Sequence, residues 1–78
     1  MEAIKERAEM QLRAIEMAYS IEIQNREEIA QLIADSAEDK MQVLIISTSI
    51  NSWIASNSIT SDVVIPLTVV SKFIKSVK

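Results

Sequence analysis

The sequence predicts an all-α fold, in which a long N-terminal amphipathic helix is followed by two shorter helices. We expect a helical hairpin or a small three- to four-helix bundle. Apolar residues recur at steps of three and four along most of the chain, which is the period of a helix that buries one face. The 78 residues also include no glycine. Tight β-hairpins need residues that accept positive φ, so a sheet of any size would be difficult to turn.

Residues 2–23 are the most strongly predicted helix. Strong helix formers dominate this segment, and neither glycine nor proline interrupts it. Its apolar face is made by Ile4, Ala8, Leu12, Ile15, Tyr19 and Ile23. A second stripe, Met10, Ala14, Met17 and Ile21, widens that face. Such stripes are usually core, and the alternative is that Met10 and Met17 form an adaptable binding surface with Tyr19.

The polar segment 24–28 interrupts both stripes. Asn25 followed by Glu28 has the form of a capping box, which would place a turn here. No glycine or proline forces a stop, so we favour one continuous helix with a kink over two separate helices. The apolar spacing then resumes with Ile29, Leu32, Ile33 and Ala37.

A new helix is predicted to begin near Ser36. Serine is a favoured N-cap residue, and Glu38 and Asp39 would then lie in the first turn, where the helix dipole stabilises acids. The first long element should therefore end between residues 35 and 39.

Residues 40–57 combine helix and strand signals. The β-branched residues favour a strand: Val43, Ile45, Ile46, Thr48 and Ile50. Helical spacing instead places one face along Val43, Ile46, Ile50, Trp53 and Ile54. Because the chain lacks glycine for hairpins, we predict a helix.

Residues 56–62 are predicted to form a loop, since small polar residues cluster there between two apolar segments. Proline is tolerated only in the first turn of a helix, so Pro66 places the start of the last helix between 62 and 66. Residues 63–65 could be extended. The last helix should run to Val77, with its apolar face along Leu67, Val70, Phe73 or Ile74, and Val77. No internal repeat of 20–50 residues is visible.

One domain is expected over residues 1–78, with a charged part at 1–39 and an uncharged part at 40–78. A domain this small buries only about 60% of its extended-chain surface, so its own core rarely contributes more than roughly 3–5 kcal/mol. The chain has no cysteine and no histidine, so disulfides and the usual zinc sites are not available to it. Self-association or partner binding is the remaining route to stability.

The charge distribution is the most informative feature. Residues 1–40 carry fifteen charges, residues 41–71 carry only Asp62, and three lysines end the chain. A long uncharged stretch indicates contact with something other than water: the protein's own core, another copy, a partner or a lipid. Eleven of residues 41–61 are polar, which argues against a transmembrane helix. The net charge of −3 and the few clustered bases make nucleic acid an unlikely partner.

The chemistry of enzymes is poorly represented. Without histidine or cysteine there is no imidazole base and no thiolate. Ser71 and Lys75 share the i,i+4 spacing of a Ser-Lys dyad, but so small a chain offers little room to desolvate a lysine. Asp35, Glu38 and Asp39 could approach a hard cation, although a capped helix start explains them better. We therefore expect no enzyme activity, no catalytic residues, no cofactor and no metal.

The sequence predicts a protein that acts through protein–protein interaction, as a homo-oligomer, adaptor, inhibitor or chaperone. Its serine-rich segment predicts a closely packed helix–helix contact, within or between chains. The expected interaction surface is Val43, Ile46, Ile50, Trp53, Ile54, Leu67, Val70, Phe73 and Ile74. Trp53 would be either a core anchor or a binding hot spot. No secretory signal is visible, so we expect a cytoplasmic location.

Two alternative functions remain open. The first is a structural subunit of a filament or virion. An acidic start, an uncharged middle and a lysine tail are similar to the charge layout of filamentous-phage coat proteins. The chain departs from that layout in its missing glycines, its serine-rich middle and Pro66, so no family is assigned. The second alternative is a membrane-associated protein held by residues 41–77.

Overall fold

Four helices and two short strands make up the part of the chain that the structure describes. The structure is a computed structural model, and it describes residues 2–59 and 63–76. In chain order the elements are α1 (Glu2–Tyr19), β1 (Glu22–Ile23), α2 (Arg26–Ser36), α3 (Lys40–Ser56), β2 (Val64–Ile65) and α4 (Leu67–Ser76). The helical fold class predicted from the sequence is therefore confirmed.

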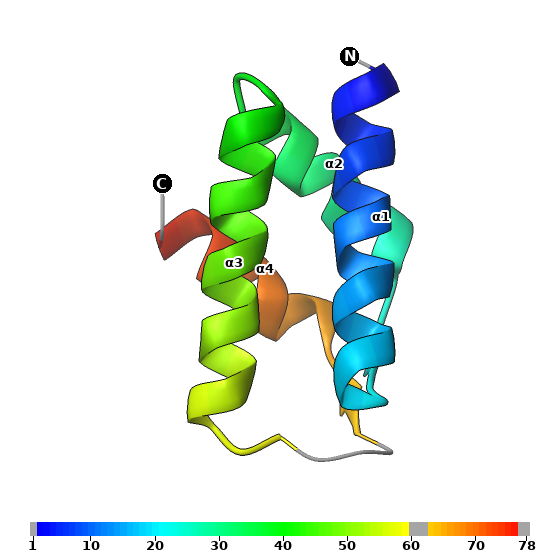
Figure 1. Ribbon diagram of the computed structural model, residues 1–78, viewed down its shortest axis with the longest axis vertical. Coiled ribbons are helices and arrows are strands. Elements are labelled where there is room, and N and C mark those ends of the chain that lie inside the picture. The colour runs from blue at the N-terminus through cyan, green and yellow to red at the C-terminus, as the bar shows by residue number, and fades with distance from the viewer. Residues whose placement is uncertain (1, 60–62, 77–78) are drawn as a thin grey trace.

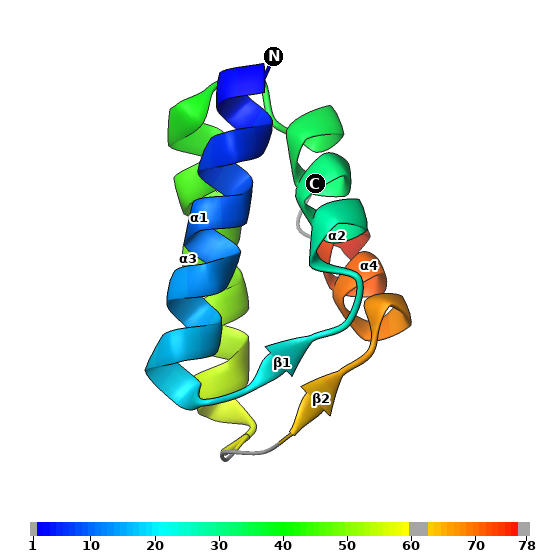
Figure 2. The same cartoon turned by 90° about the vertical axis from the view of Figure 1, so that its right-hand side faces the viewer.

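The same order, helix–strand–helix, occurs twice. α1 and α3 lie side by side and run in the same direction, and α2 and α4 form a second layer behind them (Figures 1 and 2). β1 and β2 pair in parallel, with Glu22 opposite Val64 and Ile23 opposite Ile65. The sequence showed no repeat, because only the spacing of buried residues is shared: Ile29 and Ile33 in α2 correspond to Val70 and Ile74 in α4.

Parallel pairing explains how a chain without glycine forms even a small sheet. Parallel strands are joined by a crossover through helices and need no tight hairpin turn. Each strand has only two residues, so the ladder is short. The expectation that a sizeable sheet could not be turned is consistent with this arrangement.

The expected continuity of the first long helix is wrong. α1 ends at Tyr19, and the chain then turns through β1 before α2 begins at Arg26. Ser20 and Asn25 flank this turn with φ of 53° and 55°, in the left-handed region. Asn25 precedes α2 as expected for a cap, but its side chain makes no capping hydrogen bond. Ile21 and Ile23 are buried, so tertiary packing holds the turn.

The helix predicted over residues 40–57 is confirmed as α3, but its cap differs from the expected one. Asp39, not Ser36, is the N-cap, and its side chain accepts a hydrogen bond of 3.0 Å from the Gln42 N–H. Ser36 is instead the last residue of α2. Glu38 and Asp39, the acids that predicted a helix start, do lie directly before α3. The capping residue, however, lies three positions later than expected.

The last helix begins one residue later than the predicted range. α4 starts at Leu67, directly after Pro66, whose carbonyl oxygen accepts from the N–H groups of Val69 and Val70. The extended conformation suggested for 63–65 is seen in β2. Residues 60–62 of the predicted loop and the predicted end at Val77 lie outside the described residues.

The core lies between the two helical layers and draws on every element. Its fully buried side chains include Leu12, Ile29, Ile33, Val43, Ile54 and Ile74. Among residues 2–59 and 63–76, no helix has the length and apolar character that crossing a bilayer requires.

Candidate functional site

The residues expected to form an interaction surface are mainly core residues. Six of the nine are buried inside the chain: Val43, Ile46, Ile50, Ile54, Val70 and Ile74. The other three, Trp53, Leu67 and Phe73, are partly buried against that core. The rings of Trp53 and Phe73 lie 6.0 Å apart, so both help to hold α4 on α3. The expected location needs correction, because helical periodicity marks a buried face without showing what buries it.

A second, exposed stripe lies on the opposite side of α3. It consists of Met41, Ile45, Thr48, Ser52 and Ala55, which follow one another at steps of four, three, four and three. We call these five residues the outer seam. All five are exposed, and Met41 and Ile45 expose 64% and 57% of their surface. Steps of this kind are the spacing of helices that pack along a coiled-coil seam.

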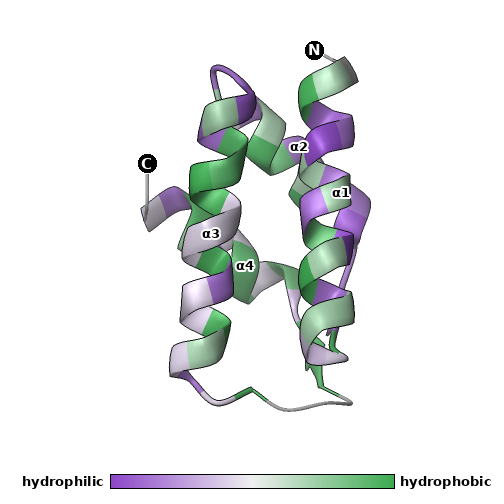
Figure 3. Cartoon of the chain, viewed as in Figure 1, coloured by the Kyte–Doolittle hydropathy of each residue, from purple (hydrophilic) through white to green (hydrophobic). Residues whose placement is uncertain are grey.

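The outer seam carries no charge. No charged residue occurs in α3 after Lys40, its first residue, although half of the positions that follow are exposed. Apolar colour dominates the upper part of α3, whereas α1 alternates between apolar and polar bands (Figure 3). Burial against a partner would therefore remove no charge from water, which is the costliest part of forming an interface.

Several hydroxyl groups of α3 already have partners within the helix. Ser49 donates to the Ile45 carbonyl oxygen at 3.1 Å, and Ser56 donates to that of Ser52 at 2.9 Å. Ser47, which is buried, donates to Val43 in the same way at 2.8 Å. A hydroxyl satisfied by its own helix can be covered by an apolar surface without losing a hydrogen bond. The serine-rich character of α3 is thus compatible with close packing.

α1 also exposes apolar side chains, set among charged ones such as Arg13. Met10 and Met17 are 62% and 82% exposed, so they are surface residues and not part of the core. Between the two helices lies a shallow groove of about 240 Å³, lined by Gln11, Ala14, Ile15, Ala18, Ser47, Thr48 and Asn51. Flexible, exposed methionines can adapt to differently shaped partners.

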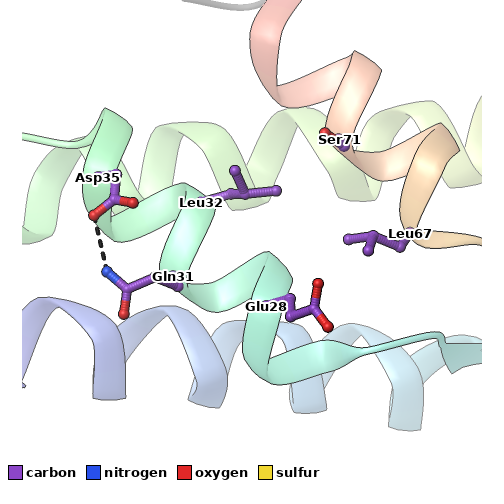
Figure 4. Close-up of a pocket in the computed structure, with 6 residues that line it drawn as sticks. All are labelled: Glu28, Gln31, Leu32, Asp35, Leu67 and Ser71. Carbon is purple, nitrogen blue, oxygen red and sulfur yellow. Dashed lines mark hydrogen bonds between the residues drawn. The ribbon is translucent and has the colours of Figure 1, made fainter.

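A second depression lies between α2 and α4. Glu28, Gln31, Leu32 and Asp35 of α2 line it together with Leu67 and Ser71 of α4, around a volume of about 280 Å³. Leu32 and Leu67 point toward each other across it, and Gln31 Nε2 donates to Asp35 Oδ1 at 2.8 Å (Figure 4). It is open to solvent and too small to enclose a ligand of ordinary size.

The other candidate residues do not come together as a chemical site. Asp39 caps α3 and Asp35 bonds Gln31, so each acid already has a local role. Within the described part of the chain, no three acidic residues are placed to hold a metal ion. Lys75 is exposed, which is unlike the desolvated lysine that a Ser-Lys dyad needs.

No family model matches the sequence, and no match is found among the curated proteins or among the solved structures. The outer seam therefore has to be interpreted from its own geometry. Its spacing was present in the sequence, but the more apolar stripe on the buried side of the same helix concealed it.

Proposed function

We propose that this protein is not an enzyme and acts by binding another protein chain, helix against helix, at the outer seam. The observation that carries the proposal is the exposed, uncharged side of α3. Surface helices of small soluble proteins normally present lysine and glutamate to water. A helix that instead exposes Met41, Leu44 and Ile45 has the composition of an interface.

The expected strength of such a contact follows from the apolar area involved. Full burial of a Leu, Ile or Met side chain is worth about 1.5–3 kcal/mol. Leu44, Met41 and Ile45 are 40–64% exposed, so each would contribute only part of that value. Together these three side chains are worth less than about 5 kcal/mol, and binding costs several kcal/mol in lost freedom of motion, so they alone give only a weak contact. The surface suits an oligomer, adaptor, inhibitor or chaperone that binds reversibly.

The composition of the seam favours a protein partner over lipid. Its apolar part is limited to the first half of α3, and Thr48 and Ser52 follow on the same side. Hydroxyl-bearing residues pack well against another helix but gain little from an acyl chain. A structural subunit of a filament or virion would use this surface together with a second contact, and it stays the alternative function.

A photo-crosslinking amino acid placed on the seam tests the proposal in cells of the native source. We expect benzoylphenylalanine at position 45 to give a covalent adduct that mass spectrometry identifies as a defined protein. The matched control is position 31, where Gln31 is exposed on α2 in the other layer. Absence of an adduct at 41, 44 and 45, or equal adducts at 31, would overturn the proposal.

A further inference from the structure

We infer that the partner at the outer seam is a second copy of this chain, with the two α3 helices packed antiparallel about a two-fold axis near Thr48. This inference rests on the proposed function and specifies its partner. It is carried by the order of side-chain sizes along the seam and by the distribution of charge between the two halves of the chain.

Side-chain size falls steadily along the seam. Met41 and Ile45 are large and lie in the N-terminal half of α3, whereas Ser52 and Ala55 are small and lie in its C-terminal half. Thr48 occupies the centre, with two seam residues on each side. A second helix that fits this surface must place small side chains opposite the large ones of the seam and large side chains opposite the small ones.

A reversed copy of the same helix meets this requirement. When two α3 helices run antiparallel with Thr48 opposite Thr48, each Met41 faces Ala55 and each Ile45 faces Ser52 of the other copy. Alternating large and small side chains across a contact fills the space between helices without voids. A parallel pair would place Met41 against Met41 and leave the two Ala55 residues facing a gap, which costs stability.

The charge distribution disfavours packing α3 of one copy on α1 of another. The first helix–strand–helix unit and the link to α3 carry fourteen of the fifteen charges of residues 1–40, and the fifteenth is Lys40 at the start of α3. Residues 41–71 carry only one. Packing α3 of one copy on α1 of the next would bury charged side chains against an uncharged surface, which is unfavourable. Packing α3 on α3 buries none. A contact that uses the same surface on both copies closes at a dimer.

The two outer edges of the small sheet differ in whether a side chain bonds their backbone. At β1, the Ile23 N–H that points away from β2 donates to Glu16 Oε2 at 2.8 Å, so this edge is closed. Among the described residues, no side chain makes a corresponding bond to β2, and Val64 is 52% exposed.

The size of the contact sets the expected affinity. A helix of 17 residues is about 25 Å long, and one such helix against another buries less area than the roughly 800 Å² per partner of a standard interface. We expect a weak dimer, visible as a mass that rises with protein concentration up to about 1 mM.

Single cysteines test the antiparallel register directly, because the chain contains none. We expect T48C to form a disulfide dimer on mild oxidation, roughly tenfold or more faster than the control Q31C, since association raises the local thiol concentration. M41C alone should form no disulfide dimer, whereas a mixture of M41C and A55C should form a disulfide-linked heterodimer. All four positions are exposed, and circular dichroism checks that each variant is folded.

Each outcome has a defined meaning. Disulfides at 48–48 and 41–55, with a dimer in sedimentation equilibrium of the unmodified chain, support the inference. A 41–41 disulfide overturns the antiparallel arrangement, and a strict monomer at 1 mM without crosslinks above Q31C overturns the second copy. If the purified chain is monomeric but position 45 still crosslinks to a different protein, the inference fails and the proposed function stands. If positions 41, 44 and 45 all give no adduct, both fail.

Discussion

At the scale of single residues, two isoleucines on α3 have opposite roles. Ile54 is completely buried, whereas Ile45 is 57% exposed. We expect I54A to lower the free energy of unfolding by about 2–5 kcal/mol, because it removes packed atoms and leaves a cavity. I45A should cost less than about 1 kcal/mol. Urea denaturation at protein concentrations below the dimer range measures both. Equal losses for the two variants would mean that the outer seam is part of the monomer's core.

Three of the residues that the structure describes have positive φ, and they allow a second residue-scale prediction. Ser20, Asn25 and Ser58 have φ of 53°, 55° and 51° in a chain without glycine. The left-handed region costs an ordinary residue about 1–2 kcal/mol, and glycine avoids that cost but loses more entropy on folding. S20G should therefore stabilise the fold by roughly 0.5–1 kcal/mol.

The matched control for this substitution is N25G. Asparagine already tolerates the left-handed conformation, so this change should gain clearly less than S20G. Thermal unfolding of both variants makes the comparison. A loss of stability in S20G would show that the serine side chain contributes more at this position than its backbone strain costs.

At the scale of elements, the sequence was sufficient to predict helices but not where the first one stops. The first predicted stripe, from Ile4 to Tyr19, describes the buried face of α1 correctly, whereas Met10, Ala14 and Met17 of the second stripe are exposed. The absence of glycine correctly predicted a helix for α3 despite its β-branched residues. Periodicity continues through Ile21 and Ile23 because both are buried, although neither is helical. What ends α1 is a contact between residues seven and ten positions apart, which local patterns do not reveal.

That contact centres on the Glu16 carboxylate. Its Oε2 accepts from the Ile23 N–H at 2.8 Å, and its Oε1 accepts from Arg26 Nε at 2.6 Å, so one side chain links α1, β1 and α2. Hydrogen bonding to Glu16 raises the pKa of Arg26. A raised pKa of a base gives stability that is present below the unfolded-state pKa and lost only as pH rises through the folded-state value. For an arginine this window is strongly alkaline, so Arg26 stays charged near neutral pH.

Removing this carboxylate should destabilise the first unit. We expect E16A to lower the free energy of unfolding by about 1–3 kcal/mol, because two hydrogen bonds are lost and the Ile23 N–H is left without its partner. E16Q should cost less, since its amide oxygen can still accept from that N–H. E22A is the control, because Glu22 is exposed and lies in β1 next to Ile23. If E16A and E22A have equal free energies of unfolding in urea, the Glu16 contacts do not hold the turn.

At the scale of the whole molecule, the composition change at residue 40 separates two structural units of similar architecture and different surface. The sequence identified the change and predicted a partner, but it assigned the interaction surface to residues of α3 and α4 that lie in or against the core. Apolar character alone could not distinguish the two sides of α3, because both carry isoleucine. The packing of α1, α2 and α4 decides which side stays in contact with water.

This separation predicts how association depends on salt. Each chain carries a net charge of −3, and its acids are concentrated in residues 1–40, away from the uncharged outer seam. Two copies therefore repel each other weakly at long range and have no ion pairs to lose at the seam. Raising sodium chloride from about 20 to about 500 mM shortens the screening length and should tighten the dimer by roughly two- to fivefold. Sedimentation equilibrium across this range gives the dissociation constants.

A dimer that weakens as the salt concentration rises would indicate a different interface. An interface held by the acids of residues 1–40 against the C-terminal lysines would weaken as salt rises, because screened ion pairs contribute less. I45K is the matched control, since it introduces one charge at the seam without touching the core. It should weaken the dimer at every salt concentration. A dimer that dissociates with salt and tolerates I45K would place the contact elsewhere on the molecule.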